Sequence, residues 1–215
     1  MTIDLKALRA ELLQEEIRQT RAEADMAELD LIIKQEQEAD RQAKPGYNRA
    51  LYINDAVVGH NVDLWIGALE HWERRLADIE RPITVTINSP GGSVMDGLAL
   101  YDTMQRLRRK GTPIITRATG LVASMATILL QAGDERIADK NVQILVHEMS
   151  SRVGGKVSGI ADEAAFFERL NDRLFNILGE RSTLSARQIK NRANRKEWWI
   201  DADEALKLGF VDRVE

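Results

Sequence analysis

An alternation of short apolar segments with amphipathic helical ones is the feature that most constrains the fold of this chain. It begins after Pro45-Gly46 and continues to the C-terminal end. Strand–helix–strand repetition requires right-handed crossovers between parallel strands, so it predicts an α/β layer fold. The strands that we expect are 50–53, 83–87, 113–118, 135–138 and 142–146, and the helices are 61–79, 94–110, 124–131, 161–178 and 202–208. We expect Asn61 to cap the first of these helices, because asparagine is a preferred N-cap residue.

The first 44 residues have a different composition from the rest of the chain. Residues 2–44 contain no Gly or Pro and are rich in Leu, Ala, Glu, Gln and Arg. Such a composition favours a helix, about 60 Å long if it is unbroken at 1.5 Å per residue. We therefore divide the chain into a helical N-terminal extension (1–44), interpreted as a docking or oligomerisation arm, and a main domain (45–215). The alternative for the extension is a solvated, partly frayed tail.

Composition also excludes several classes of protein. The absence of cysteine excludes a disulfide scaffold, a cysteine nucleophile, thiolate zinc sites and iron–sulfur clusters. Residues 1–44 carry seven basic and eleven acidic residues, which accounts for the whole net charge of −4. The main domain is therefore neutral and offers no general field for nucleic acid or an anionic membrane. The longest apolar run, 121–132, is too short to span a bilayer, and the early acidic residues argue against a secretory signal. We expect a cytoplasmic protein.

Two residues of the main domain could carry nucleophilic catalysis. His147 follows an apolar strand, and strand ends are where α/β proteins place catalytic groups. Ser124 lies between an expected strand and a buried helix, where backbone N–H groups and the helix dipole favour an oxyanion. Serine needs a base to remove its proton, and His147 is the candidate. Each residue also has a structural explanation, as an ordinary hydrogen-bonded histidine and as an N-cap. Gly91-Gly92 suits a tight turn or an oxyanion hole equally well.

Several linked motifs decide between these interpretations. In order and at compatible spacing, residues 87–94, 99–105, 120–125, 144–147 and 202–212 closely resemble the proteolytic subunit of the Clp protease. The resemblance covers about residues 47–215. It implies a spiral α/β fold shared with crotonases, a serine endopeptidase activity on polypeptides, and no metal or organic cofactor.

The resemblance also implies roles for individual residues. Ser124 matches the nucleophile, His147 the general base, and the backbone N–H groups of Gly92 and Met125 the two oxyanion donors. A gapless match places Glu197 where the family has its third member, an aspartate. The extra methylene of a glutamate changes its reach, so Asp201 and Asp203 stay as alternatives.

Partners are also implied by the resemblance. Clp subunits form rings that stack through a handle helix, which helix 161–178 matches. Its apolar residues form more than one stripe, so we expect a homo-oligomer. The extension occupies the place where Clp subunits have a short segment that meets an ATPase unfoldase. A related group of Clp-like proteases matures bacteriophage heads, and a helical arm would suit docking on a capsid or scaffold protein.

Three other functions are considered for this chain. One is a non-catalytic structural subunit of a Clp-like assembly. The second is a crotonase-type acyl-CoA enzyme, on grounds of fold alone. The third is a peptidase with a lysine base, which His147 makes unnecessary.

Overall fold

The computed structural model describes residues 49–74, 81–150 and 156–215, together with five isolated residues of the extension. The chain divides into two compact units, Met1–Asn48 and Arg49–Glu215. In the first unit the described residues, all helical, are Arg18, Gln19, Arg21, Met26 and Lys34. The rest of the helix expected over 2–44 lies outside the described residues, as do residues 76 and 79 of the first main-domain helix and residues 153–155. The account below concerns the second unit.

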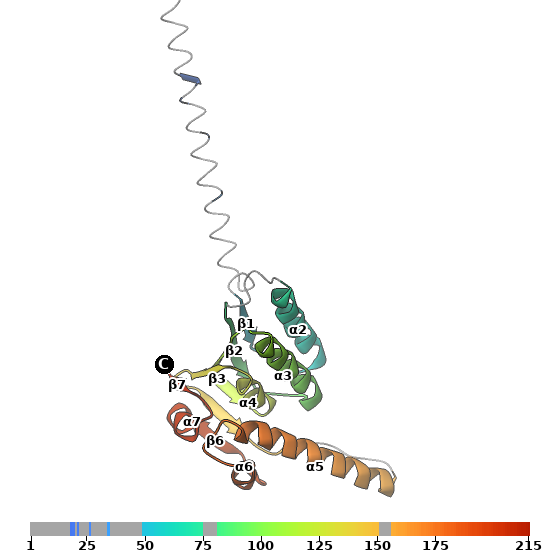
Figure 1. The fold of residues 1–215 in the computed structure, drawn as a ribbon. Helices are drawn as coiled ribbons and strands as arrows, with labels where there is room; N and C mark the ends of the chain where they lie inside the picture. Colours follow the sequence, from blue (N-terminus) through green and yellow to red (C-terminus); the bar gives the residue numbers. More distant parts are fainter. Residues whose placement is uncertain are drawn as a thin grey trace, which may run out of the picture. The chain divides into compact units, whose positions relative to one another are not determined.

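A mostly parallel sheet runs through the second unit (Figure 1). Its described strands are β1 (Ala50–Ile53), β2 (Ile83–Ser89), β3 (Ile114–Ala123), β4 (Glu135–Ala138), β5 (Gln143–Val146), β6 (Trp198–Asp201) and β7 (Arg213–Val214). The order β1-β2-β3-β4-β7 is parallel throughout, whereas β5 pairs with β3 and, in antiparallel fashion, with β6. The prediction of an α/β fold is therefore confirmed.

The described helices pack against the sheet or against one another. They are α2 (Gly59–Glu73), α3 (Val94–Arg109), α4 (Met125–Leu130), α5 (Val157–Gly179), α6 (Ala186–Ala193) and α7 (Ala202–Leu208). Helices α2, α3 and α4 follow one another along the sheet (Figure 1). Strand β2 shows the effect: Ile83, Val85 and Ile87 are fully buried, and the intervening Thr84 and Thr86 are half-buried. Successive side chains of a strand point to opposite faces, so only the aliphatic set reaches the core.

Several boundaries differ from those expected. The prediction that Asn61 caps the first helix is wrong: α2 begins at Gly59, its N-cap Val58 has no side-chain capping bond, and Asn61 Nδ2 donates to the carbonyl oxygen of Ala56 at 2.9 Å. Helix α5 begins four residues earlier than expected, at Val157. Helix α6 and strands β6 and β7 were not expected from the sequence.

Strand β3 changes partner along its length because of an irregularity at residues 119 and 120. Its first half pairs with β4 and its last residues pair with β5, while its register with β2 shifts between Ile87 and Ser89. Gly120 has φ +57, and the Leu121 N–H donates to Asn88 Oδ1 at 3.0 Å, which closes the irregular turn. The shift lets the end of β3 lie beside β5, and this pairing positions the residue that follows β3.

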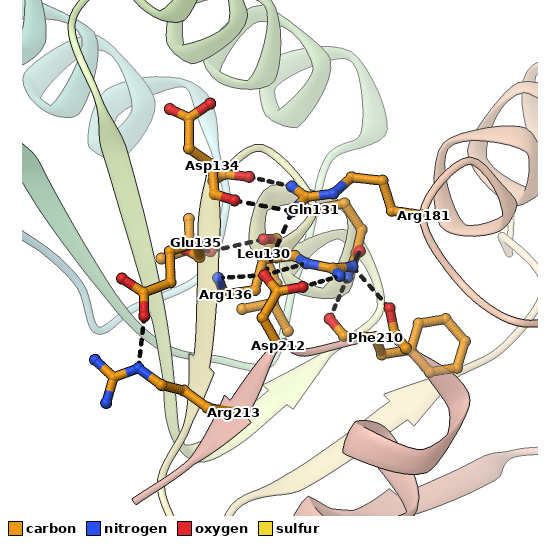
Figure 2. A network of polar contacts seen from close by, with 12 residues as sticks. Leu130, Gln131, Asp134, Glu135, Arg136, Arg181, Phe210, Asp212 and Arg213 are labelled. Atoms are coloured by element: carbon orange, nitrogen blue, oxygen red, sulfur yellow. Dashed lines mark hydrogen bonds and ion pairs between the residues drawn. The ribbon is translucent and has the colours of Figure 1, made fainter.

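A buried arginine network holds the far end of α4 (Figure 2). Arg136 is 3% exposed, and its guanidinium donates to both carboxylate oxygens of Asp212 at 3.0 and 2.6 Å. It also donates to Gln131 Oε1 at 2.6 Å and to the carbonyl oxygen of Gly209 at 2.8 Å. Partial burial opposes ionisation of Asp212, but its hydrogen bonds to Arg136 and the charges of Arg136 and Arg181 hold its pKa below the ordinary value. The network ties α4, β4 and the segment between α7 and β7 together.

Within the described part of the chain, no helix has both the length and the apolar character needed to cross a bilayer.

Candidate active site

Ser124 lies at the junction between β3 and α4 in an unusual backbone conformation. Its φ and ψ are 56° and −124°, a region that residues other than glycine rarely occupy. Its N–H donates to the carbonyl oxygen of Leu145 at 2.9 Å, so the end of β5 holds it in place. A conformation of this kind costs about 1–3 kcal/mol and persists only where the surrounding structure enforces it, most often at functional sites.

The Ser124 side chain does not cap the helix that follows it. Although Ser124 is the N-cap of α4, its side chain makes no capping bond. Thr127 binds the Ser124 carbonyl oxygen instead, through its N–H at 2.9 Å and its hydroxyl at 2.7 Å. The explanation of Ser124 as a side-chain cap therefore has no support. The hydroxyl oxygen has no hydrogen-bond partner among the described residues.

The glycine pair after β2 lies directly against Ser124. A Cβ added to Gly91 would come within 2.7 Å of the Ser124 Cβ and 2.8 Å of the Met125 nitrogen. Only glycine can bring its backbone this close, and Gly91 has φ +85. The N–H groups of Gly92 and Met125 have no acceptor within the described ranges. Within the described residues, these two backbone donors are therefore available to bind an oxyanion next to Ser124.

His147 lines the same pocket as Ser124. The pocket is otherwise mainly apolar, with walls from α3, α4, β5 and α5, and its lining includes Val94, Met125, Ile128, Val146, Leu174 and Phe175. No hydrogen bond joins the Ser124 hydroxyl to His147 in the part of the chain that the structure describes. Such bonds often tighten only when substrate binds, so the arrangement remains compatible with a nucleophile and its base.

The pairing of β5 with β6 brings Glu197 to His147. In this antiparallel ladder Val146 lies opposite Trp198 and Leu145 opposite Trp199. One position beyond the last pair, the same register sets His147 opposite Glu197, where Cβ atoms are typically about 5 Å apart. Both residues line a second hollow next to the Ser124 pocket. His147 thus lines both the pocket that contains Ser124 and the hollow that contains Glu197.

The two alternative acids lie elsewhere. Asp201 is at the other end of β6, opposite Gln143, and about 13 Å from Glu197 at 3.3 Å per strand residue. Its carboxylate caps α7 by accepting from the Glu204 N–H at 2.8 Å. Asp203 belongs to α7 and lines a different hollow with Asp201 and Lys207. Neither shares a pocket with His147.

Two polar residues that the sequence did not single out hold the segment after His147. Glu148 Oε2 accepts from the Arg195 N–H at 3.4 Å, and Asn171 Oδ1 accepts from the Met149 N–H at 3.3 Å. Arg195 has φ +53 and lies in the turn before β6. These contacts join the segment after His147 to the turn before Glu197 and to α5. No sequence signal marks either contact, although the spacing of Ser185 and Gln188 matches the capping box that begins α6.

Comparison with known proteins shows the family to which the chain belongs. Residues 34–215 match the Clp protease family, and the chain belongs to that family. It is 39% identical over 140 residues to an ATP-dependent Clp protease proteolytic subunit 3 from Rhodococcus jostii (strain RHA1), covering 64% of this chain and 67% of the relative. It is 37% identical over 168 residues to a proteolytic subunit 1 from Salinibacter ruber (strain DSM 13855 / M31), covering 77% and 70%. A proteolytic subunit from Porphyromonas gingivalis (strain ATCC BAA-308 / W83) is 34% identical over 140 residues, covering 64% and 61%. The family assignment made from the sequence motifs is confirmed.

Proposed function

We propose that this chain is a serine endopeptidase that cleaves polypeptides through an acyl-enzyme. The observation that carries the proposal is the shared pocket of Ser124 and His147, with Ser124 in a strained conformation and its hydroxyl without a hydrogen-bond partner among the described residues. Its relatives are proteolytic subunits of an ATP-dependent protease, which supports the same reaction class.

The proposed reaction uses the Ser124 hydroxyl, the His147 imidazole and two backbone N–H groups. His147 accepts the Ser124 hydroxyl proton as the oxygen attacks the peptide carbonyl carbon. The carbonyl oxygen becomes an oxyanion that accepts from the N–H groups of Gly92 and Met125. The C–N bond then breaks as His147 returns the proton to the leaving amine, and water hydrolyses the acyl-enzyme by the same steps. Glu197 would orient the imidazole and stabilise its charged form.

Labelling with a fluorophosphonate probe, together with hydrolysis of a fluorogenic peptide, tests this reaction. Wild type should label and cleave, whereas Ser124→Ala and His147→Ala should lose both signals. Ser185→Asn, which changes an exposed serine at the start of α6 to another preferred N-cap residue, is the matched control and should behave like wild type. If the assembled wild-type protein neither labels nor cleaves, the proposal fails and a non-catalytic structural subunit becomes the better assignment. Binding of coenzyme A would instead favour the acyl-CoA enzyme.

We also propose that the protein works as a homo-oligomer built through α5. The C-terminal half of this helix is buried, with Phe175, Ile177 and Leu178 each 2% exposed. Its N-terminal half extends beyond the rest of the unit (Figure 1), and every residue from 158 to 166 is exposed, Ile160 and Phe166 among them. Exposed apolar side chains on a projecting helix are typical of a subunit contact.

The extension is proposed as a docking arm for the protein substrate or its carrier. Two carriers fit the expected function: an ATPase unfoldase, or a capsid or scaffold protein in a phage. Removing residues 1–44 should leave assembly and peptide cleavage intact and abolish processing of the protein substrate. Loss of assembly in the truncated protein would instead assign the arm to oligomerisation.

A further inference from the structure

Ser89 is a buried polar residue at the end of β2 to which the proposed reaction assigns no task. It is 1% exposed, and its hydroxyl both donates and accepts. The hydroxyl donates to the carbonyl oxygen of Asp55 at 2.6 Å and accepts from the Gly91 N–H at 3.1 Å. It therefore joins the segment after β1 to the glycine pair that lies against Ser124.

The same segment fixes the peptide plane between Gly91 and Gly92. The Gly91 carbonyl oxygen accepts from the Val57 N–H at 2.9 Å, and the Ser93 N–H donates to the Val57 carbonyl oxygen at 2.7 Å. The peptide is trans and planar, so the Gly92 N–H points opposite to the Gly91 carbonyl and away from Val57. A Cβ on Gly92 would lie 2.3 Å from the Val57 oxygen, which shows how closely the two segments pack.

The segment that includes Val57 is itself held from two sides. Ser89 holds the Asp55 carbonyl, and Asn61 Nδ2 of α2 donates to the neighbouring Ala56 carbonyl at 2.9 Å. Removal of the Ser89 hydroxyl would leave a part-buried carbonyl and a buried N–H without their partner, and both segments would shift to satisfy them. A shift of the Gly91–Gly92 peptide redirects the Gly92 N–H.

We propose that Ser89 is a positioning residue that aims the Gly92 N–H at the developing oxyanion. The inference rests on the proposed serine peptidase function and extends it to a residue that does not touch the substrate. An oxyanion donor works only when it is pre-aligned with the oxygen of the tetrahedral state, so a small misalignment weakens the transition state more than the bound substrate.

Replacement of Ser89 by Ala tests the proposal. Rates are expressed per Ser124 labelled by the fluorophosphonate probe, so that unfolded protein does not count. Loss of one oxyanion donor lowers kcat by about 100- to 1000-fold, so misdirection of one should lower it by about 10- to 100-fold. KM should stay within about twofold of wild type. Affinity for a peptide boronate, which forms a tetrahedral adduct, should fall by the same factor as kcat/KM. Affinity for an uncleaved peptide, measured with Ser124→Ala as the background, should not change.

Two further variants separate positioning from general stability. Thr116→Val removes another fully buried hydroxyl, which donates to the carbonyl oxygen of Leu130 at 2.8 Å at the far end of α4. It should lower the melting temperature without changing kcat per labelled site. Ser89→Thr keeps the hydroxyl and should retain most of the wild-type kcat.

The outcomes distinguish the inference from the function on which it rests. If wild type cleaves with a Ser124-dependent rate and Ser89→Ala keeps its kcat, the inference is wrong and the function stands. A loss in Ser89→Ala confined to KM, or a loss of kcat equal to that of Thr116→Val, also overturns it. If wild type shows no Ser124-dependent cleavage, the proposed function itself fails.

Discussion

Replacement of Gly91 by Ala should damage both the stability of the protein and its proposed activity. Gly91 has φ +85, and an added Cβ would lie 2.5 Å from the Ala123 carbonyl oxygen and 2.7 Å from the Ser124 Cβ. Neither neighbour is a flexible side-chain end that could swing aside. Relief of the overlap must therefore move the backbone of the nucleophile or of the glycine pair.

A matched control separates the two contributions to the loss of stability in Gly91→Ala, which are backbone strain and steric overlap. Gly111, at the end of α3, has φ +94 and no atom within 4 Å of an added Cβ. Gly111→Ala therefore carries only the backbone strain, about 1–3 kcal/mol. Gly91→Ala carries the same strain and an overpacking cost of about 1–3 kcal/mol more. A displacement of 1 Å in a catalytic group can lower the rate about 100-fold, so kcat/KM should fall by about that factor in Gly91→Ala alone.

Urea unfolding and peptide hydrolysis measure the two effects. Gly91→Ala should lose more free energy of unfolding than Gly111→Ala and should also lose activity, whereas Gly111→Ala should keep the kcat/KM of wild type. Equal stability and equal activity in the two variants would refute the reasoning, because they would mean that the contact between Gly91 and Ser124 does not exist in solution.

The acid, the buried network and the helix contact give three further predictions. Glu197→Gln should lower kcat by about 10⁴-fold, the scale of a lost triad acid, whereas Asp201→Asn should leave it near wild type; the opposite ranking in peptide hydrolysis would contradict the register argument. Asp212→Asn should cost about 2 kcal/mol at pH 7, since it weakens the partner of the buried Arg136 but Asp212 itself is about one-third exposed. The pKa of Asp212 is lower in the folded protein than in the unfolded chain, where it is about 3.9. The ionised carboxylate therefore stabilises the folded protein fully above about pH 3.9, and this stabilisation is lost as the pH falls through the folded-state pKa. The melting temperatures of Asp212→Asn and wild type should therefore converge in acid. Phe166→Asp should reduce the mass measured by light scattering while the melting temperature of the subunit changes little; an unchanged mass would count against assembly through α5.

Much of the fold follows from local sequence. Strands β2 and β5 and helix α4 were predicted because most of their side chains are apolar, in continuous or alternating runs, and the apolar ones are buried. Strand β6 was missed because it has four residues, flanked by charged ones, and its partner β5 lies about 50 residues earlier in the chain. The start of α2 was misplaced because Asn61 makes a tertiary contact with Ala56 instead of capping the helix.

The candidate site could be predicted only in part. The motifs and a gapless match predict Ser124, His147 and Glu197, with Asp201 and Asp203 as alternative acids. The strand register, which depends on a non-local pairing, sets Glu197 and not Asp201 opposite His147. The strained backbone of Ser124 and the contact of Ser89 with Asp55 also arise from segments that are distant in the sequence. Patterns of apolar residues carry no information about such contacts.

The pairing of β5 with β6 also determines when the candidate site can form during synthesis and folding of the chain. A ribosome releases Ser124 and His147, the proposed nucleophile and base, long before it releases Trp198, and β6 can pair only after the turn that carries Glu197 has emerged. Pairing across a long loop is also slow, because the loop must close before its contacts form. The nascent chain therefore holds an unfinished set of the proposed catalytic groups until β6 has paired. The proposed peptidase would acquire its hydrolytic activity late, when few unfolded segments of its own remain to be cut.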